Sequence, residues 1–309
     1  MLATISGKKA SRFSFGTMQF GAKASEADSA EMYADCRAAG INFFDTAHAY
    51  TEGNSERILG QLAADERDDV FIATKCAGTV VAKPDVIRAE FDESRKRLGM
   101  DGVDLLYLHR WDPETPLEAT YEVMAEWVKE GSVRYVGVSN YSAWQVMKAR
   151  QLAQSMGIDI HVIQPMYNLV KRQVEVEILP MAISEGFAVC PYSPLGGGLL
   201  TGKYAAGQGG RLEDDPMYNK RYGTAWMYEA AEGLSRLASK VGVDPATLAV
   251  SWVAQHKGVY GPIISARSAA QLAPSLAAVT FEMDKAIYDE ISRLSPTPPP
   301  ATDRLEEAG

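Results

Sequence analysis

The sequence predicts an α/β protein that folds as a single-domain (β/α)8 barrel over residues 1–294. Short segments rich in β-branched and aromatic residues alternate with longer amphipathic segments along nearly the whole chain. The 309 residues show no break in composition, and barrels of this class commonly exceed about 250 residues as one domain. A doubly wound sheet is the structural rival. It normally carries a GxGxxG turn after its first strand, which Gly16 and Gly21 do not form.

The expected strands are short, and several of them are almost wholly apolar. Continuous apolar runs of this length are typical of strands in a parallel sheet that is covered on both faces. In chain order the expected strands are residues 13–17, 41–44, 70–73, 103–108, 133–138, 160–163, 187–190 and 259–264.

The segments between these strands carry a helical pattern. Within 117–128 and again within 230–241, apolar residues recur at i, i+4, i+7 and i+11, which places them on one face of a helix. Pro84 and Pro116 each stand where a helix is expected to begin, a position that tolerates the missing N–H of proline. The alternation of strand and helix therefore extends through both halves of the chain.

Two segments depart from this alternation. Residues 205–225 are polar and follow the seventh expected strand, so we expect a long loop on the catalytic face that acts as a lid or binding loop. Residues 295–309 are rich in proline and charge, and we expect a flexible, extended C-terminal tail.

Charge and hydropathy narrow the classes of function. The chain has 31 Lys and Arg against 40 Asp and Glu, a net charge of −9, and no cluster of basic residues. Such a surface repels phosphate backbones and anionic lipids, which argues against nucleic-acid and membrane partners. No stretch approaches the roughly 20 apolar residues of a membrane span, and residues 1–13 lack the apolar core of a signal peptide. We therefore expect a soluble, cytoplasmic protein.

Cysteine and histidine do not form metal-binding patterns. The three cysteines are widely spaced without a CxxC, which indicates free thiols in a reducing compartment. The four histidines show neither HxxxH nor HExxH spacing, so we expect no metal site. These residues are Cys36, Cys76, Cys190, His48, His109, His161 and His256.

Ionisable side chains follow three successive expected strands. Asp45 comes directly after the second strand, with Tyr50 five residues later, while Lys75 follows the third strand and His109 the fourth. In a barrel, the carboxyl ends of the strands form the catalytic face, so these four groups are expected to meet in one mouth.

The four groups suit proton transfer to a carbonyl oxygen. A tyrosine, with an ordinary pKa of about 10, is a poor acid near neutrality unless a neighbouring cation lowers that pKa. Lys75 can supply the cation, Asp45 can hold it charged, and His109 can hydrogen-bond the carbonyl. Singly, each residue has a plainer interpretation: a surface lysine, a structural histidine, or a tyrosine that caps the barrel. Their joint placement favours chemistry.

The segments around these residues resemble signature segments of the aldo-keto reductase superfamily, along nearly the whole chain. The resemblance implies a barrel that binds NADP(H) across its C-terminal face, and a catalytic tetrad of Asp45, Tyr50, Lys75 and His109 with Tyr50 as proton donor. The segments are INFFDTAHAY (41–50), GNSERILG (53–60), FIATKC (71–76), LLYLHRW (105–111), GVSN (137–140), QPMYN (164–168) and YSPLGGGLLTGKY (192–204). HRWDPETP (109–116) and GGGLLTGKY (196–204) are most similar to the bacterial and potassium-channel-β-like branches.

The same resemblance implies cofactor contacts. Polar side chains would bind the nicotinamide carboxamide, an aromatic ring would stack on the nicotinamide, and the glycine-rich segment would line the pyrophosphate, where a backbone can approach closely. The carboxamide residues are Ser139, Asn140 and Gln164; the stacking ring is Tyr192; the pyrophosphate residues are Ser193, Leu195, Gly197 and Lys203.

A third cofactor group follows the eighth expected strand. Ser265, Arg267 and Gln271 suit the adenosine 2′-phosphate, and the Arg267 guanidinium favours NADP(H) over NAD(H) because it can grip a phosphate bidentately. Many relatives carry Glu-Asn where this chain has Pro274-Ser275, a departure at the adenine contact. How strictly NADP(H) is preferred, the physiological substrate, the reaction direction and the oligomeric state stay open.

Three alternatives to an NADPH-dependent reductase of an aldehyde, ketone or sugar remain. An NADPH-binding redox-sensing module with slow turnover could keep the tetrad. A class I aldolase would use Lys75 as a Schiff base, and a barrel glycosidase would pair Asp45 with Asp112. Five residues are weaker candidates for the substrate pocket, supported only by their expected positions near the mouth of the barrel. They are Met18, Gln19, Phe20, Trp111 and Trp226.

Overall fold

The structure is a computed structural model that describes residues 2–204, 209–304 and 306. Within these residues the chain forms two compact units. The first comprises 1–165, 187–190 and 265–272, and the second comprises 166–186, 191–264 and 273–309. Each is described here by itself.

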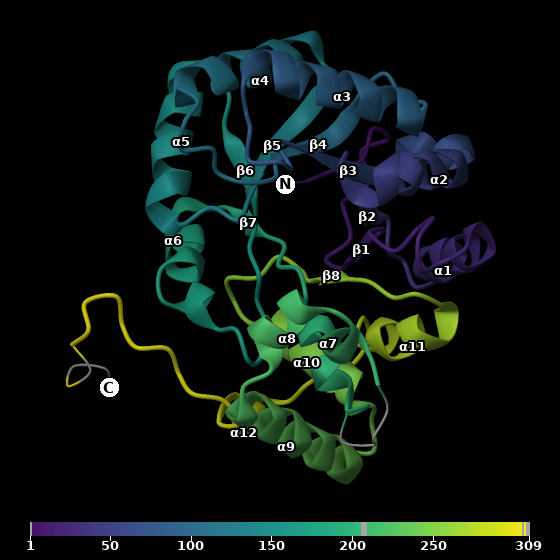
Figure 1. Cartoon of the computed structure of the whole chain (residues 1–309), viewed down its shortest axis with the longest axis vertical. Coiled ribbons are helices and arrows are strands. Elements are labelled where there is room, and N and C mark those ends of the chain that lie inside the picture. The colour runs from purple at the N-terminus through teal and green to yellow at the C-terminus, as the bar shows by residue number, and fades with distance from the viewer. Residues whose placement is uncertain (1, 205–208, 305, 307–309) are drawn as a thin grey trace. The chain divides into compact units, whose positions relative to one another are not determined.

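The first unit is built on a parallel sheet in which the strands β1 to β7 lie side by side in chain order (Figure 1). Each neighbouring pair is parallel, from β1 with β2 through to β6 with β7. The strands are β1 (Ser14–Gly16), β2 (Phe43–Asp45), β3 (Phe71–Cys76), β4 (Val103–Leu108), β5 (Val133–Ser139), β6 (Ile160–Gln164) and β7 (Ala188–Val189).

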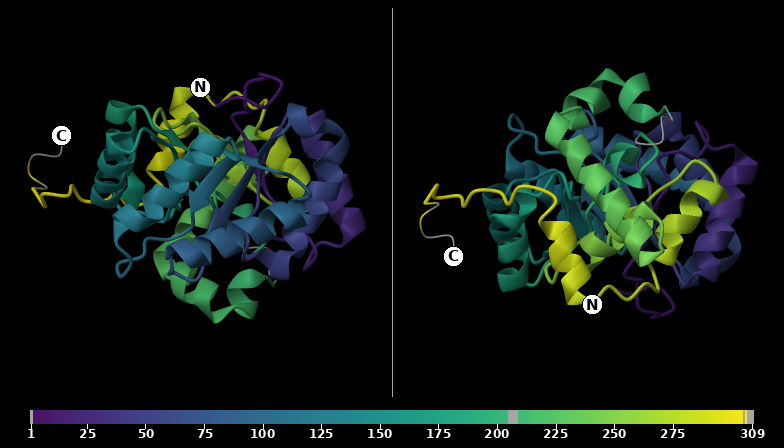
Figure 2. Two further views of the ribbon diagram at one scale, coloured as in Figure 1. Left: turned by 90° about the horizontal axis from the view of Figure 1, so that it is seen from above. Right: turned by 90° about the horizontal axis from the view of Figure 1, so that it is seen from below.

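Helices follow the strands of this unit one by one. Consecutive helices from α1 to α5 pack side by side, α3 lies on β3, and α4 lies on β5. Figure 2 shows these helices, coloured from purple to teal, in two further views. The strands β3 and β4 are buried at every residue. Strands of a parallel sheet that are covered on both faces are typically apolar, which explains the sequences of these two. The helical segments are α1 (Glu26–Ala38), η1 (Tyr50–Gly53), α2 (Asn54–Ala63), η2 (Ala64–Asp69), α3 (Pro84–Leu98), α4 (Leu117–Glu130) and α5 (Ala143–Ser155).

Local signals set the ends of these helices. Ser25 caps α1 through a capping box with Asp28. Pro84 is the first residue of α3, and Pro116 directly precedes α4, so both predicted helix starts are confirmed. Both helices end at a glycine in the left-handed region, Gly99 at φ 66° and Gly131 at φ 83°, a conformation that glycine adopts without steric cost.

The second unit is mainly helical. Within it, α10 packs against both α9 and α12. Its elements are η3 (Gln173–Glu175), α6 (Ile178–Glu185), η4 (Gly196–Thr201), α7 (Arg211–Asp214), α8 (Pro216–Tyr222), α9 (Ala225–Val241), α10 (Pro245–Gln255), β8 (Ile263–Ile264) and α12 (Lys285–Ser292). A further helix, α11 (Ala269–Ala277), starts in the first unit and ends in the second.

Eight strands that alternate with helices, counted over the described residues, are the architecture of a (β/α)8 barrel, and the predicted fold class is confirmed. Every expected strand overlaps an observed one. The last is shorter than expected because Pro262 offers no N–H to a sheet. A single domain over 1–294 stays a prediction. No helix within 2–204, 209–304 and 306 is long and apolar enough to cross a lipid bilayer.

The predicted long loop at 205–225 is wrong for most of its described part. Residues 209–225 contain α7 and α8, whereas 205–208 lie outside the described residues. The second of these helices has the ordinary start signals: Asp215 accepts hydrogen bonds from the N–H groups of Met217 and Tyr218, and Pro216 occupies the first turn. The tail has no helix or strand over 295–300, and its flexibility stays a prediction.

Candidate active site

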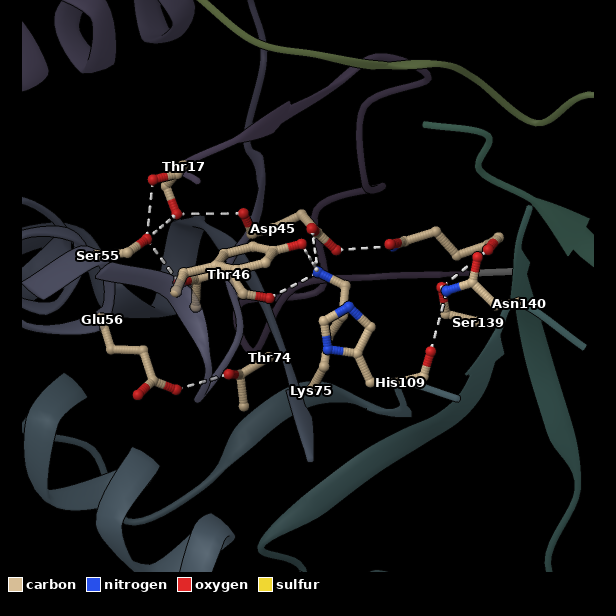
Figure 3. A network of polar contacts seen from close by, with 12 residues as sticks. Thr17, Asp45, Thr46, Ser55, Glu56, Thr74, Lys75, His109, Ser139 and Asn140 are labelled. Carbon is tan, nitrogen blue, oxygen red and sulfur yellow. Dashed lines mark hydrogen bonds and ion pairs between the residues drawn. The ribbon is translucent and has the colours of Figure 1, made fainter. Parts of the chain in front are cut away.

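The centre of the site is the fully buried ammonium of Lys75, at the end of β3 (Figure 3). Its Nζ donates to Asp45 Oδ1, to the backbone carbonyl of Thr46 at 2.7 Å, and to the hydroxyl of Tyr50 at 3.3 Å. An ammonium has three N–H donors, and these three acceptors use all of them. The lysine is therefore fixed in position, and one of its protons points at a phenol oxygen.

The sheet brings these residues together. Asp45 is the last residue of β2, Lys75 lies near the end of β3, and His109 directly follows β4. The three strands are neighbours and parallel, so their carboxyl ends lie along one edge. Tyr50 opens the helical turn η1 that follows β2. The predicted meeting of the four side chains is what the structure shows.

The electrostatics of the pair favour a charged lysine. Burial alone lowers the pKa of Lys75, but the charge of Asp45 and the contact with Tyr50 outweigh it, so the net shift of this pKa is upward. Burial raises the pKa of Asp45, opposed by Lys75 and by a hydrogen bond from Gln164 Nε2 at 2.8 Å. A lysine held charged in this way is a hydrogen-bond donor and not a nucleophile.

His109 presents a neutral ring beside the tyrosine. Burial, together with the charges of Lys75 and Arg110, lowers the pKa of His109 to about 3. Its ring lies edge-to-face with that of Tyr50, with 5.9 Å between the ring centres. The buried Nδ1 atom has no hydrogen-bond partner among the residues that the structure describes. The imidazole can therefore bind a polar ligand atom without carrying charge.

The predicted carboxamide residues adjoin this centre. Gln164 reaches Asp45 as described, and the Ser139 hydroxyl donates to the Gln164 carbonyl at 2.9 Å. Asn140, at a left-handed φ of 58°, donates from Nδ2 to Ser139 Oγ and to the His109 carbonyl, both at 3.0 Å. One hydrogen-bonded cluster thus contains the tetrad and all three amide-binding candidates.

The predicted pyrophosphate residues lie in the second unit. Tyr192 is half-buried and forms a parallel bridge with Met166, and Leu195 directly precedes η4. The glycine run that includes Gly197 has successive positive φ angles of 57°, 67° and 97° at residues 196–198. Successive backbone N–H groups in such turns form concave sites for anions.

Two further members of this group flank the glycine run. Ser193 also has a positive φ, 58°, and its carbonyl accepts a hydrogen bond from Asn168 Nδ2 at 2.9 Å. The side chain of Lys203 lies against the glycine run: a Cβ placed on Gly198 would be 3.3 Å from Lys203 Nζ. A cation therefore lies beside the left-handed glycine turn.

The predicted 2′-phosphate residues belong to the first unit. Ser265 and Gln271 are exposed, and Arg267 is half-buried and forms no ion pair within the described part of the chain. Ser275, the second residue of the departure expected at the adenine contact, is 1% exposed. Its side chain is therefore part of the interior and not of a ligand-facing surface.

The pocket candidates differ in their surroundings. Phe20 is fully buried against Phe15, so it is a core residue. Met18 and Trp226 are half-buried, Gln19 is buried, and nothing in the structure assigns them a ligand. Trp111 is half-buried two residues after His109.

An aromatic cluster surrounds Trp111. The indole packs edge-to-face against Tyr141 at 5.2 Å and Trp144 at 5.6 Å between ring centres. Trp144 is 61% exposed and lies in the first turn of α5. It was not singled out from the sequence, because it stands just outside the GVSN segment.

Asp112 is not a free catalytic carboxylate. Its oxygens accept hydrogen bonds from the backbone N–H groups of Ala82, Glu114 and Thr115, and from the Thr115 hydroxyl at 2.6 Å. These bonds hold the loop after β4 and lower the pKa of Asp112 in spite of its burial. The arrangement disfavours the glycosidase interpretation, which needs a carboxylic acid at this mouth.

Some members of the site could not be found from the sequence. Thr46 contributes a backbone carbonyl, a group that every residue has, so no residue type signals it. Ser55 lies in the GNSERILG segment, yet only the structure shows its buried hydroxyl beneath the tetrad. All three cysteines are free thiols, as expected. They are also buried, and burial raises the pKa of each thiol.

Comparison with known proteins gives a consistent result. The model of the aldo/keto reductase family matches residues 12–296. A probable voltage-gated potassium channel subunit beta from Oryza sativa subsp. japonica is 34% identical over 291 residues, 89% of each chain. The uncharacterized oxidoreductase YrpG of Bacillus subtilis is 31% identical over 314 residues, 94% of each chain. Aflatoxin B1 aldehyde reductase member 2 of Rattus norvegicus is 40% identical over 195 residues, 61% of this chain and 53% of the relative.

Proposed function

The chain belongs to the aldo/keto reductase family, and from this premise we propose that it reduces an aldehyde, ketone or sugar carbonyl to the alcohol with NADPH, with Tyr50 as proton donor. The observation that carries the proposal is the hydrogen bond from the Lys75 ammonium to the Tyr50 hydroxyl, at 3.3 Å. A cation that donates to a phenol oxygen stabilises the phenolate, and so makes the phenol a stronger acid.

Each residue of the tetrad then has a defined role. The neutral His109 hydrogen-bonds the substrate carbonyl oxygen and polarises it. When bound, NADPH supplies the hydride that adds to the carbonyl carbon. Tyr50 gives its proton to the oxygen as negative charge develops there, while Lys75 holds the phenolate and Asp45 keeps Lys75 charged and oriented. General acid catalysis of this kind contributes roughly 10²- to 10⁴-fold in rate.

The residues present fit the nicotinamide end of the cofactor. Gln164 uses its Nε2 for Asp45, so its side-chain oxygen would accept a hydrogen bond from the carboxamide N–H. Ser139 and Asn140 would add further polar atoms to the same contact. The unpartnered Nδ1 of His109 indicates a polar ligand in the same place. Tyr192 would stack on the nicotinamide ring.

The phosphate groups of the cofactor have two candidate sites. Ser193, Leu195 and Gly197 would hold the pyrophosphate through the left-handed glycine turn, with the Lys203 ammonium beside it. Ser265, Arg267 and Gln271 would hold the 2′-phosphate, which is the reason for proposing NADP(H) over NAD(H).

Two observations bear on the alternatives. A Schiff-base lysine needs a lowered pKa and access to substrate, whereas Lys75 is buried and its pKa is raised, which disfavours an aldolase. The similarity to potassium channel β subunits favours a redox-sensing module as the second candidate. The buried thiols make cysteine oxidation an unsuitable signal for it, so such a module would sense through NADPH itself. We further propose a soluble cytoplasmic enzyme whose partner is a small carbonyl compound.

The test is NADPH oxidation, followed by its absorbance, with a panel of aldehydes, ketones and sugars. Wild type is compared with Tyr50→Phe and with Tyr121→Phe, a control that also removes one phenol hydroxyl. The Tyr121 hydroxyl is buried and has no hydrogen-bond partner among the described residues. Turnover that is lost only in Tyr50→Phe, with NADPH still bound, supports the reductase. Binding without turnover of any compound would favour the sensing module, and the absence of NADPH binding would overturn the cofactor assignment.

A further inference from the structure

The backbone directly after Tyr50 is left-handed at three consecutive residues. Thr51 has φ 47°, Glu52 has φ 54° and Gly53 has φ 88°. Glycine adopts such angles freely, but for a β-branched residue such as Thr51 a positive φ is a genuine outlier. Strained residues of this kind persist only where the surrounding structure holds them, and they cluster at functional sites.

The hydroxyl of Thr51 stabilises this left-handed turn through two hydrogen bonds. It donates to the backbone carbonyl of Phe20 at 3.0 Å, in the segment that follows β1. The same oxygen accepts a hydrogen bond from the backbone N–H of Ser55 at 2.8 Å, in the first turn of α2. One side chain therefore fastens the turn that begins at Tyr50 to two separate parts of the unit.

Ser55 carries the connection inward to the floor of the site (Figure 3). Its fully buried hydroxyl lies 2.7 Å from the hydroxyl of Thr17 and 2.9 Å from that of Thr46, and donates to the carbonyl of Thr17 at 2.8 Å. The carbonyl of Thr46 is in turn an acceptor of the Lys75 ammonium. A chain of residues linked by hydrogen bonds thus runs from Thr51, through Ser55 and Thr46, to Lys75; within Ser55 and Thr46 the connection passes between the side chain and the backbone.

This chain joins the two partners of the proton-donating pair. Tyr50 is fixed from one end by the turn that Thr51 holds, and Lys75 is fixed from the other end by the Thr46 carbonyl. The Nζ-to-hydroxyl distance of 3.3 Å lies at the long limit of a hydrogen bond, so a small movement of the turn would break it.

We propose that Thr51 is a positioning residue, whose hydroxyl holds Tyr50 within hydrogen-bonding distance of Lys75 for proton transfer. The inference rests on the proposed reductase function. Thr51 touches neither substrate nor cofactor in this role, and it acts only through the turn and through Ser55.

The experiment compares Thr51→Val, which keeps the branched shape but removes the hydroxyl, with Thr51→Ser, which keeps the hydroxyl. Thr120→Val is the matched control, because Thr120 is a buried threonine whose hydroxyl likewise donates to a backbone carbonyl, that of Ala82. We expect Thr51→Val to lower kcat for carbonyl reduction by roughly 10- to 100-fold, since a misplacement of about 1 Å can cost 10². The KM for NADPH should stay within about twofold, and Thr51→Ser should recover most of the rate.

The pH profile separates positioning from simple destabilisation. Without the ammonium contact the phenolate is less favoured, so the alkaline limb of reduction should move to higher pH in Thr51→Val and not in Thr120→Val. Difference titration of each protein against its Tyr50→Phe counterpart reports ionisation of the phenol without any turnover, and should shift the same way. Wild type without turnover on any carbonyl would refute the reductase, while this titration would still decide the role of Thr51. An unshifted titration with an unchanged kcat, or a loss that Thr51→Ser does not restore, would refute the role.

Discussion

The hydroxyl of Tyr50 lies 3.3 Å from the ammonium nitrogen of Lys75, although 25 residues separate them in the chain. The ammonium of Lys75 is held in place, because its other two N–H groups donate hydrogen bonds to Asp45 and to the Thr46 carbonyl. A fixed, buried positive charge beside a phenol oxygen favours the ionised form of that phenol, and this arrangement underlies the predictions below.

Removal of the Lys75 charge should destabilise the fold. In Lys75→Met, the buried carboxylate of Asp45 keeps only the hydrogen bond from Gln164, and breaking a buried pair costs about 3–5 kcal/mol in the free energy of unfolding. Urea denaturation at neutral pH measures this loss. Because burial raises the pKa of Asp45, the loss should shrink as the pH falls and the carboxyl becomes neutral. The double variant Asp45→Asn/Lys75→Met should regain more than half of the loss. Strictly additive losses would contradict the coupling of the pair.

His109 should make stability depend on pH in the acidic range. Its pKa is about 3 in the folded protein against 6.5 ordinarily, so between these values the unfolded chain binds more protons than the folded one. The free energy of unfolding should therefore fall as the pH is lowered from 6.5 towards 3, and His109→Gln should flatten that slope. Chemical denaturation at several pH values measures it. Equal slopes in both proteins would show that the ring is not held neutral.

Arg267 should determine the preference for NADPH. Its guanidinium forms no ion pair among the described residues, and loss of a charge-assisted phosphate contact costs about 1.5–3 kcal/mol. Arg267→Ala is expected to raise the Kd for NADPH by roughly 10- to 100-fold and to leave the Kd for NADH unchanged. Fluorescence titration with both nucleotides gives the ratio. Arg236→Ala, which removes an exposed charge from α9, is the control. Equal weakening of NADPH and NADH would place Arg267 away from the 2′-phosphate.

Gly60 should resist substitution although it lies in a helix. Alanine is favoured over glycine there by about 1 kcal/mol in helix propensity. A Cβ at this position would lie 2.2 Å from the backbone carbonyl oxygen of Leu98, and a backbone atom at the end of α3 cannot move aside cheaply. We expect Gly60→Ala to lower the free energy of unfolding by about 1–3 kcal/mol, as measured by urea denaturation. Gln61→Ala, at the exposed neighbouring position, should change it little. A stabilised Gly60→Ala would refute the close packing of α2 on α3.

Much of the first unit was readable from residue type and spacing. The apolar runs located the strands, and because parallel strands share one edge, chemical side chains at three strand ends could be expected to meet. Asp45, Lys75 and His109 were found in this way. The polar composition of 205–225 was misleading, since α8 buries Tyr222 while its other residues stay at least partly accessible. A polar composition indicates that a segment is accessible to solvent, but an accessible segment can still form a helix.

The sequence by itself determined the barrel class and the placement of Asp45, Lys75 and His109 at three neighbouring strand ends, because these follow from periodicity and from residue type. Only the tertiary structure decided how Lys75 and Tyr50 are held beside each other. The Thr46 carbonyl that fixes Lys75 is a backbone group common to all residues, and the left-handed turn at Thr51 depends on partners at Phe20 and Ser55. Such features arise when packing brings distant backbone atoms within hydrogen-bonding range, and local sequence carries no record of those distances.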